Sequence, residues 1–331
     1  MAVWSTTTAR VRPTLGRLRR APAKVRTVLR PPAVPVPEAV VQPVPVPRFA
    51  PDERPRVLWP LYAPPRYLGQ LDPAFQHRML IEREYLELAD CDFYHAVDLG
   101  PEGVQSGVWD LQGREREYFG GVDVGGRRVL ELGPASGGLT AWLDGEGADV
   151  VCFDAGFDRS VDLMPWHTGD LRTSELVMMR AAGAVHNAWW YTKRARGLRA
   201  QMVYGPIYEL PGDLGTFDVS LFGALLLHLR RPFDALAEAA RVTRDVMVVT
   251  EPVDPDLRDV PGPVCKFNPV HESHPSTLWW SFSPAIIVEQ LRVLGFGDST
   301  VTYHEQPHQF GHDRDAALTA APMFTVVARR A

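Results

Sequence analysis

Residues Val129–Gly138 read VLELGPASGG, an apolar run that meets an acid and then a turn of small residues. The apolar residues suit a strand buried on both faces, and Leu139–Leu143 continues as the start of a helix. Gly133, Ala135 and Gly137 keep the main chain of the turn accessible, because small residues let a ligand approach the backbone closely. The stretch therefore predicts a strand–turn–helix unit that holds a nucleotide-like ligand.

A second predicted strand ends in a second acid. The segment Asp149–Asp154 reads DVVCFD, and Asp154 lies about 20 residues beyond the turn, where doubly wound folds place the carboxylate that binds ribose hydroxyls. A dinucleotide site shares this layout but has the spacing G-x-G-x-x-G, whereas this turn has G-x-A-x-G. The spacing favours a different nucleoside cofactor, with a dinucleotide oxidoreductase as the weaker alternative.

Further apolar runs and amphipathic segments extend this unit into an α/β fold. The expected strands are Gln201–Gly205, Phe217–Phe222, Asp245–Glu251, Thr300–His304 and Phe324–Ala328, and the expected helices are about Arg172–Arg196, Pro232–Val242 and Pro284–Leu294. A chain of 331 residues that is 45% hydrophobic can build one sizeable α/β domain with an accessory segment.

The N-terminal residues differ in composition from the rest of the chain. Residues 1–50 contain nine Lys and Arg against one acid, Glu38, while the remaining 26 basic and 39 acidic residues give a charge of −13. The region is also rich in proline, so residues 1–55 are expected to form a disordered basic tail. Organellar transit peptides share this composition, but Pro13 and Pro22 interrupt an amphipathic helix and favour a solvated tail.

Cysteine usage and hydropathy indicate the cellular setting. The cysteines Cys91, Cys152 and Cys265 are few and widely spaced, which fits a reducing cytoplasm. No stretch of the sequence approaches the length of a transmembrane span. The expectation is a cytoplasmic protein, and nothing in the sequence fixes its oligomeric state.

Several short motifs together carry a family resemblance. They are Tyr94-His95, Asp98-Leu99, Gly107–Asp110, Glu131–Gly138, Asp154, Phe217-Asp218, Gly223–His228, Thr250–Pro252 and Leu294–Phe296. From about Tyr94 to Arg330 the chain resembles class I S-adenosylmethionine (SAM)-dependent methyltransferases. Its pattern is most similar to the branch around the tRNA wobble-uridine carboxymethyltransferase.

This resemblance implies a Rossmann-like sheet of seven strands, in which a terminal hairpin adds an antiparallel strand to a parallel core. Residues 126–331 would form the SAM-binding methyltransferase domain, and 56–125 an N-terminal helical cap segment. Within that segment, Asp72-Pro73 has the form of a helix start, and the helix would continue to about Leu88. The tail of residues 1–55 precedes it.

The resemblance also implies a SAM site. The residues expected to bind the cofactor are Glu131, Gly133, Ala135, Gly137, Asp154, Ile207 and Trp109. Glu131 would approach the methionine amino end, and Trp109 would cover the sulfonium or pack in the core. Many relatives place an acid for adenine where this chain reads Gly205–Tyr208, so the Ile207 backbone and apolar packing are expected to bind adenine instead. No basic residue is assigned to the extra carboxylate of carboxy-SAM, which makes ordinary SAM the expected cofactor.

Two histidines are candidate catalytic residues. His228 follows the apolar run Val219–Leu227 and should emerge at the carboxyl edge of the sheet, where it would serve as a base for an oxygen acceptor. The alternative is a histidine that caps or packs the helix beginning at Pro232. His95 is the second candidate, and its near-neutral pKa suits either a catalytic or a structural role.

Two long connections near the carboxyl edge are expected to cover the substrate, because both are rich in aromatic residues and histidine. The candidate substrate-binding residues are Tyr94, Trp189, Trp190, Trp279 and Trp280. No metal is expected: Cys265, His271 and His274 lack familiar zinc spacing, and Pro307 and Gly311 would break the helix needed to align His304, His308 and His312.

The leading functional prediction is methyl transfer from SAM to an oxygen or nitrogen atom of a small molecule. An RNA-modifying transferase of the wobble-uridine type is the alternative; the basic tail supports it and the acidic body opposes it. A third reading is a SAM-binding scaffold without turnover. Nucleic acid is therefore a less favoured partner than a small molecule.

Overall fold

The computed structural model describes residues 87–155, 162–165, 171–269, 277–309 and 317–331. The predicted tail and nearly all of the helix predicted after Asp72-Pro73 lie outside these ranges. So do His271, His274 and His312.

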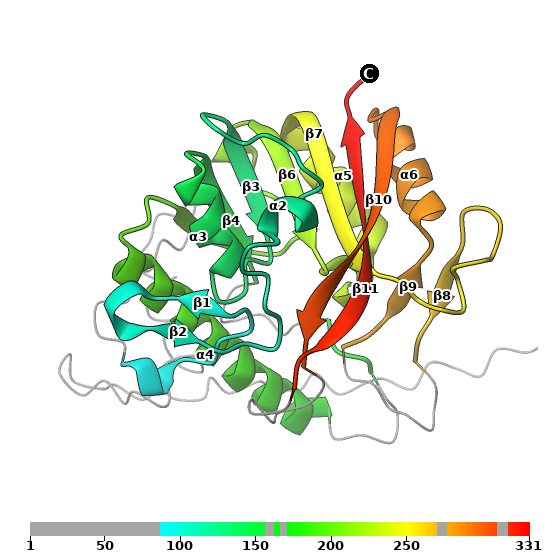
Figure 1. The fold of residues 1–331 in the computed structure, drawn as a ribbon. Helices are drawn as coiled ribbons and strands as arrows, with labels where there is room; N and C mark the ends of the chain where they lie inside the picture. Colours follow the sequence, from blue (N-terminus) through cyan, green and yellow to red (C-terminus); the bar gives the residue numbers. More distant parts are fainter. Residues whose placement is uncertain (1–86, 156–161, 166–170, 270–276, 310–316) are drawn as a thin grey trace, which may run out of the picture. The chain divides into compact units, whose positions relative to one another are not determined.

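A seven-stranded mixed sheet forms the centre of the described residues, in the order β10-β11-β7-β6-β3-β4-β5 (Figure 1). Its strands are β3 (Arg128–Leu132), β4 (Asp149–Asp154), β5 (Gln201–Tyr204), β6 (Phe217–Gly223), β7 (Thr243–Pro252), β10 (Asp298–His308) and β11 (Thr319–Arg329). Strands β3 to β7 are parallel, and β11 runs antiparallel between β7 and β10. The predicted parallel core with an antiparallel strand from a terminal hairpin is confirmed.

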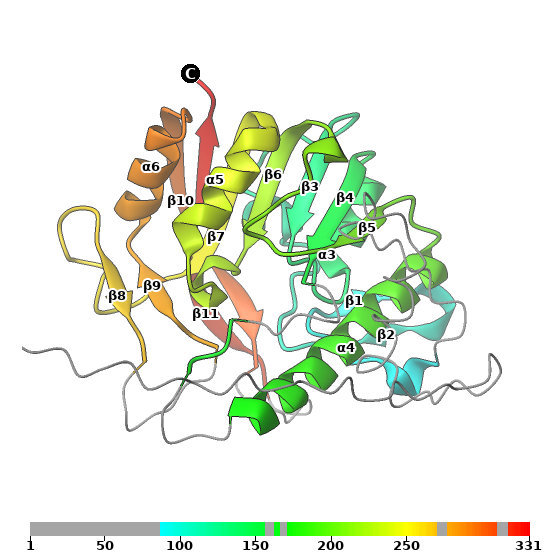
Figure 2. The same cartoon turned by 180° about the vertical axis from the view of Figure 1, so that it is seen from behind.

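Helices cover both faces of this sheet, because neighbouring residues of a strand point to opposite faces. Val129 belongs to one hydrophobic core, with α3 (Gly138–Gly145) and α4 (Leu171–Arg196). Leu130 belongs to the other, with α5 (Pro232–Val242) and α6 (Pro284–Val293). Figure 2 shows α5 and α6 in front of the sheet. The α/β fold class is thus confirmed, and the three helices predicted after residue 170 match within one residue at each end.

The predicted helical cap segment differs from what the structure shows of it. In residues 87–125 the structure has η2 (Leu88–Asp90), β1 (Val97–Asp98), η3 (Gly100–Glu102), β2 (Val104–Gln105) and α2 (Glu115–Tyr118). Glycines explain the absence of a long helix there: Gly103 and Gly113 have φ of 77° and 74°, and a Cβ on Gly107 would lie 2.3 Å from the His95 carbonyl carbon.

Several further elements gather where the parallel strands end. Figure 1 shows the β1–β2 pair, α4 and a hairpin of β8 (Cys265–Phe267) and β9 (Trp280–Phe282) at that end of the sheet. The turns η4 (Gly212–Leu214) and η5 (Leu226–His228) precede and follow β6. The described helices include none with the length and apolar character that crossing a membrane requires.

Candidate functional site

The carboxyl ends of adjacent parallel strands bring distant residues together. Leu132 is paired with both Phe153 and Phe222, and Gly223 is paired with Thr250. The residues that follow these strand ends therefore share one edge, which is where ligands bind in open α/β sheets.

The small-residue turn after β3 has the backbone that its sequence predicts. Gly133, Ala135 and Gly137 have φ of 69°, 49° and 85°, so three alternate residues lie in the left-handed region. A Cβ on Gly137 would lie 3.1 Å from the Trp189 ring. The turn is thus closed from behind by α4, and its small residues are required by both conformation and packing.

Glu131 lies buried directly before this turn. It is 2% exposed, and its Oε2 accepts hydrogen bonds from Thr140 Oγ1 at 2.6 Å and Cys152 Sγ at 3.3 Å. Burial raises the pKa of Glu131 to about 7, while the bonds from Thr140 and Cys152 act in the opposite direction. A cation placed beside this carboxyl would hold it ionised.

Asp154 ends β4 and has a partner that the sequence did not assign to it. The two carboxylate oxygens are used differently: Oδ1 accepts the Ala155 amide at 2.7 Å, and Oδ2 lies 3.3 Å from Nε2 of His186. His186 comes from α4 and is 4% exposed. The side chain of Asp154 remains 21% exposed, which leaves it reachable by a ligand.

The segment around His95 crosses over the small-residue turn. The His95 amide donates to Ser136 Oγ at 2.9 Å, and Ser136 Oγ donates to the His95 carbonyl at 3.3 Å. Burial lowers the pKa of His95 to about 4, so its ring is neutral at neutral pH. Its Nδ1 has no hydrogen-bond partner among the described residues.

Tyr94 and Trp109 form a pair beside this crossing. Trp109 Nε1 donates to Tyr94 Oη at 3.2 Å, and the Trp109 ring lies 4.1 Å from that of His308. Trp109 is 8% exposed and belongs to the core on the α3 side. The structure supports the packing role for Trp109.

Two buried residues at the same edge were not assigned by the sequence analysis. Tyr118 Oη would lie 3.1 Å from a Cβ on Gly223, at the end of β6. Glu251, near the end of β7, is 1% exposed; its Oε1 accepts the Leu226 amide at 2.8 Å, and its Oε2 has no partner among the described residues. Burial raises the pKa of Glu251 to about 8. Burial also raises the pKa of Tyr118, and a negative charge on Glu251 raises it further.

An acid that follows an apolar run could have revealed Glu251, since Asp154 was recognised in that way. Tyr118 carries no such signal, because its approach to Gly223 depends on the fold of the preceding segment.

His228 lies in η5, and its ring is held from one side. Its Nδ1 is 3.1 Å from the Thr277 carbonyl oxygen, which can only accept, so the proton is on Nδ1 and the lone pair on Nε2. Burial lowers the pKa of His228, and the bond to Thr277 opposes this shift. The ring is therefore neutral at neutral pH, as a base requires.

The four predicted substrate tryptophans do not lie together. Trp189 is fully buried and donates to Thr140 Oγ1 at 3.1 Å, and Trp190 donates to Tyr204 Oη at 2.9 Å. Both belong to the core behind the turn, a packing position that gives no support to their predicted contact with substrate.

Of the other predicted residues, Trp280 and Ile207 pack against the core on the opposite face of the sheet, and Trp279 is buried beside Arg230. Trp279 Nε1 donates to the Asp162 carbonyl at 2.5 Å, and Arg230 stacks on its ring at 5.0 Å. Trp280 is partly buried and lines a cavity, so it remains available to a substrate. Ile207 follows β5 and packs against the core that contains α5.

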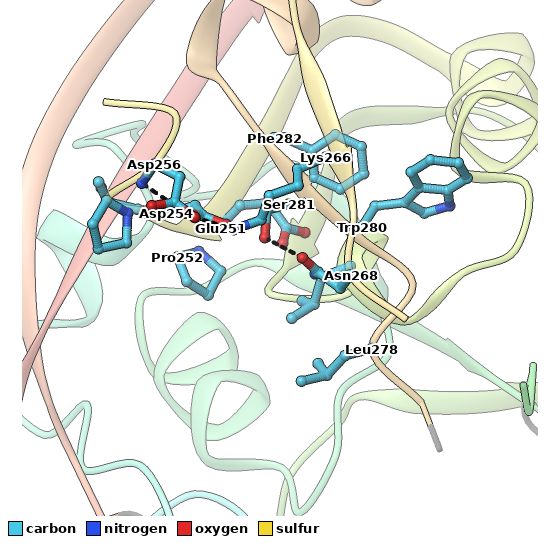
Figure 3. Close-up of a pocket in the computed structure, with 13 residues that line it drawn as sticks. Glu251, Pro252, Asp254, Asp256, Lys266, Asn268, Leu278, Trp280, Ser281 and Phe282 are labelled. Atoms are coloured by element: carbon cyan, nitrogen blue, oxygen red, sulfur yellow. Dashed lines mark hydrogen bonds and ion pairs between the residues drawn. The ribbon is translucent and has the colours of Figure 1, made fainter. Parts of the chain in front are cut away.

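That cavity has a volume of about 500 Å³ and lies between the end of β7 and the β8–β9 hairpin (Figure 3). Glu251 and Pro252 line one side, and Lys266 and Trp280 line the other. Among the described residues, no group of three or more His, Cys, Asp or Glu is arranged to hold a metal ion.

No protein-family model matches the chain, and neither does any curated protein sequence. Among solved structures, the N-terminal domain of EvdMO1 with S-adenosylhomocysteine (SAH) bound is 22% identical, with 65% of this chain and 78% of that chain covered and a TM-score of 0.36. Magnesium protoporphyrin IX methyltransferase (ChlM) from Synechocystis PCC 6803 with bound SAH is 14% identical. The match covers 67% of this chain and 82% of that chain, with a TM-score of 0.41.

A third similar structure is 1,6-didemethyltoxoflavin-N1-methyltransferase from Burkholderia thailandensis, with bound 1,6-didemethyltoxoflavin and SAH. It is 19% identical, covers 65% of this chain and 74% of that chain, and has a TM-score of 0.37.

Proposed function

We propose that this protein is a SAM-dependent methyltransferase that acts on an oxygen or nitrogen atom of a small molecule. The observation that carries the proposal is the turn Gly133–Gly137, with left-handed backbone at three alternate residues, placed beside Asp154 at the carboxyl edge of the sheet. A nucleoside cofactor needs this combination of an accessible backbone and a ribose-binding carboxylate.

The residues at this edge fit the parts of the cofactor. Asp154 would accept hydrogen bonds from the ribose hydroxyls, with His186 fixing the orientation of its carboxylate. Glu131 would face the positively charged amino end, since a buried carboxyl with a raised pKa is stabilised in its ionised form by a cation. Ile207 would pack against adenine, and the turn would contact the cofactor through its main chain.

When bound, the cofactor supplies a methyl group on a positively charged sulfur. The chain's own contribution is then alignment of the acceptor and removal of its proton. His228 is the residue we propose as the base, because the Thr277 carbonyl fixes the proton on Nδ1 and leaves Nε2 as the acceptor. His95 is a second candidate; its ring is neutral, its Nδ1 has no partner in the part of the chain that the structure describes, and its backbone also anchors the turn.

The decisive experiment compares two acids at opposite ends of β4. In Asp154→Asn the ribose contact loses its charge, so SAH affinity measured by calorimetry should fall by about 1.5–3 kcal/mol, the scale for hydrogen bonds to charged groups. Asp149→Asn is the matched control, because Asp149 lies at the start of the same strand and its side chain is 70% exposed.

The control should bind SAH as tightly as the wild type. Equal SAH affinity in wild type and Asp154→Asn would contradict the placement of the ribose. Absence of SAH and SAM binding to the wild-type chain would contradict the proposed function itself.

A further inference from the structure

The cavity beside Glu251 has the position expected of an acceptor site. Glu251 lies next to Pro252 at the end of β7, and β7 pairs with β6, whose end is Gly223. The opposite wall is the β8–β9 hairpin, which contributes Lys266, Trp280 and Phe282 (Figure 3). A volume of about 500 Å³ is in the range that small-molecule sites occupy.

Among the ionisable side chains that line the cavity, acidic groups outnumber basic ones. Three carboxyl groups, those of Glu251, Asp254 and Asp256, line it together with one ammonium group, that of Lys266. Lys266 Nζ lies 2.6 Å from Asp254 and 2.9 Å from Asp256, so its single charge is shared between two carboxylates. The pKa of Asp254 is lowered, because its bonds with Lys266 and Ser281 outweigh its burial.

Glu251 adds a binding group that no described residue satisfies. One carboxyl oxygen accepts the Leu226 amide, while Oε2 is buried without a partner in the part of the chain that the structure describes. Buried carboxyl oxygens are costly when unpaired, because they have lost water and gained nothing in exchange. A ligand that donates a hydrogen bond, above all a charged one, would remove this cost.

The apolar part of the wall suits the same kind of ligand. Trp280 and Phe282 line the cavity, and Phe282 is 3% exposed. Aromatic side chains attract cations to their faces and pack well against apolar ligand groups. An anionic ligand would instead meet an excess of carboxylates.

From the cavity, the Glu251 oxygen that no described residue pairs with and the surplus of acidic groups, we infer that the acceptor of the proposed methyl transfer is a small molecule with a positively charged basic nitrogen, bound beside Glu251. This inference rests on the proposed function, because the ligand is a methyl acceptor only if the chain transfers methyl groups. The selectivity of the cavity for a cation is measurable as binding alone.

The test uses the full chain saturated with SAH and three probes that share a phenyl ring and differ in their polar end: 2-phenylethylamine, 2-phenylethanol and phenylacetate. Titrations followed by ligand-observed NMR should rank the amine tightest and the carboxylate weakest. Glu251→Gln should weaken the amine by roughly ten- to hundredfold, the range for a hydrogen bond between charged groups, while 2-phenylethanol changes little.

Two further variants make the result specific. Glu289→Gln removes an acid from the exposed face of α6, outside the cavity, and should leave all three affinities unchanged. Lys266→Gln removes the one ammonium group among the described lining residues, so it should strengthen the amine and weaken phenylacetate. This second change has the opposite sign and does not depend on how well Glu251→Gln folds.

Phenylacetate binding as tightly as the amine, or no binding of the amine at any soluble concentration, would overturn the inference. So would an amine preference that survives both Glu251→Gln and Lys266→Gln. The SAH titration separates the two proposals: SAH binding without an amine preference removes only the cation-selective site, whereas a chain that fails to bind SAH removes the methyltransferase proposal.

Discussion

Glu131 and Glu251 are both buried carboxyls at the ligand-binding edge, but their surroundings differ. Glu131 is held by Thr140 and Cys152, whereas one oxygen of Glu251 has no partner among the described residues. Burial raises the pKa of both groups, to about 7 and about 8. Each is thus close to the point where a neighbouring cation decides its charge.

The first prediction concerns the pH dependence of stability through Glu251. Its pKa is about 8 in the folded protein, while an unfolded Glu has a pKa of about 4.3. Between these values the folded chain keeps a proton that the unfolded chain has lost, so the contribution of Glu251 to the free energy of unfolding decreases as pH rises, by up to about 1.4 kcal/mol per pH unit.

Glu251→Gln removes this titration. The free energy of unfolding of the wild type minus that of the variant, measured with urea from about pH 5 to pH 7.5, should therefore decrease with pH. Taking the difference cancels the contributions of Glu131 and the histidines. A difference that stays constant over this range would show that Glu251 titrates normally in the folded chain.

The second prediction concerns His228 as the base. Once an oxygen acceptor is known, His228→Ala and His228→Asn should lower turnover by about 10²–10⁴-fold and leave SAM affinity nearly unchanged, because the ring would act on the acceptor and not on the cofactor. Melting temperature, SAM affinity and turnover are the three measurements. Near-normal turnover in both variants would favour His95 or an amine acceptor that needs no protein base.

At the scale of elements, α4 is the support of the proposed cofactor site. It places Trp189 behind Gly137, donates from Thr192 Oγ1 to the Ser136 carbonyl at 2.9 Å, and brings His186 to Asp154. A single helix thus fixes both the turn and the ribose-binding acid.

The third prediction follows from this arrangement. Trp189→Ala should destabilise the fold by about 3–5 kcal/mol, because it removes a fully buried indole from the core. Trp280→Ala, which shortens a partly buried side chain at the cavity, should cost less stability. Thermal and urea unfolding measure both variants. If Trp189→Ala unfolds like the wild type but loses acceptor binding, the original substrate-contact prediction holds.

The strands and helices of the sheet were predictable because their patterns are local. Two of the strands are built from the apolar runs Val129–Leu132 and Asp149–Asp154, which are bounded by turn residues, and α5 begins with proline at its first position. The residues next to each element therefore determine where it begins or ends. The small-residue turn was predictable for the same reason.

The parts that were missed depend on contacts between distant residues. His186 meets Asp154 only because α4 returns to the end of β4, and the β8–β9 hairpin consists of three-residue strands with no long alternating pattern. Trp189 and Trp190 were predicted to bind substrate because their segment is rich in aromatic residues. Composition does not distinguish a helix face that is buried in the core from one that faces a binding site.

At the scale of the whole molecule, the fourth prediction concerns the tail. Residues 1–55 lie outside the described residues. A segment of this proline-rich, basic composition cannot bury enough apolar area to offset the entropy lost when it becomes ordered. A chain that starts near Pro55 should therefore keep its melting temperature and its SAH affinity. A drop of several degrees in melting temperature would show that the tail packs on the body.

The segment 277–281, which leads into β9, serves two purposes at once. Leu278, Trp280 and Ser281 shape the cavity, and the carbonyl of Thr277, one residue before them, fixes the tautomer of His228. Under the proposed function, evolution could not remodel this hairpin for a new acceptor without also altering the base. Acceptor range and reaction rate would be inherited together, and an engineer who wishes to change one should expect to re-optimise the other.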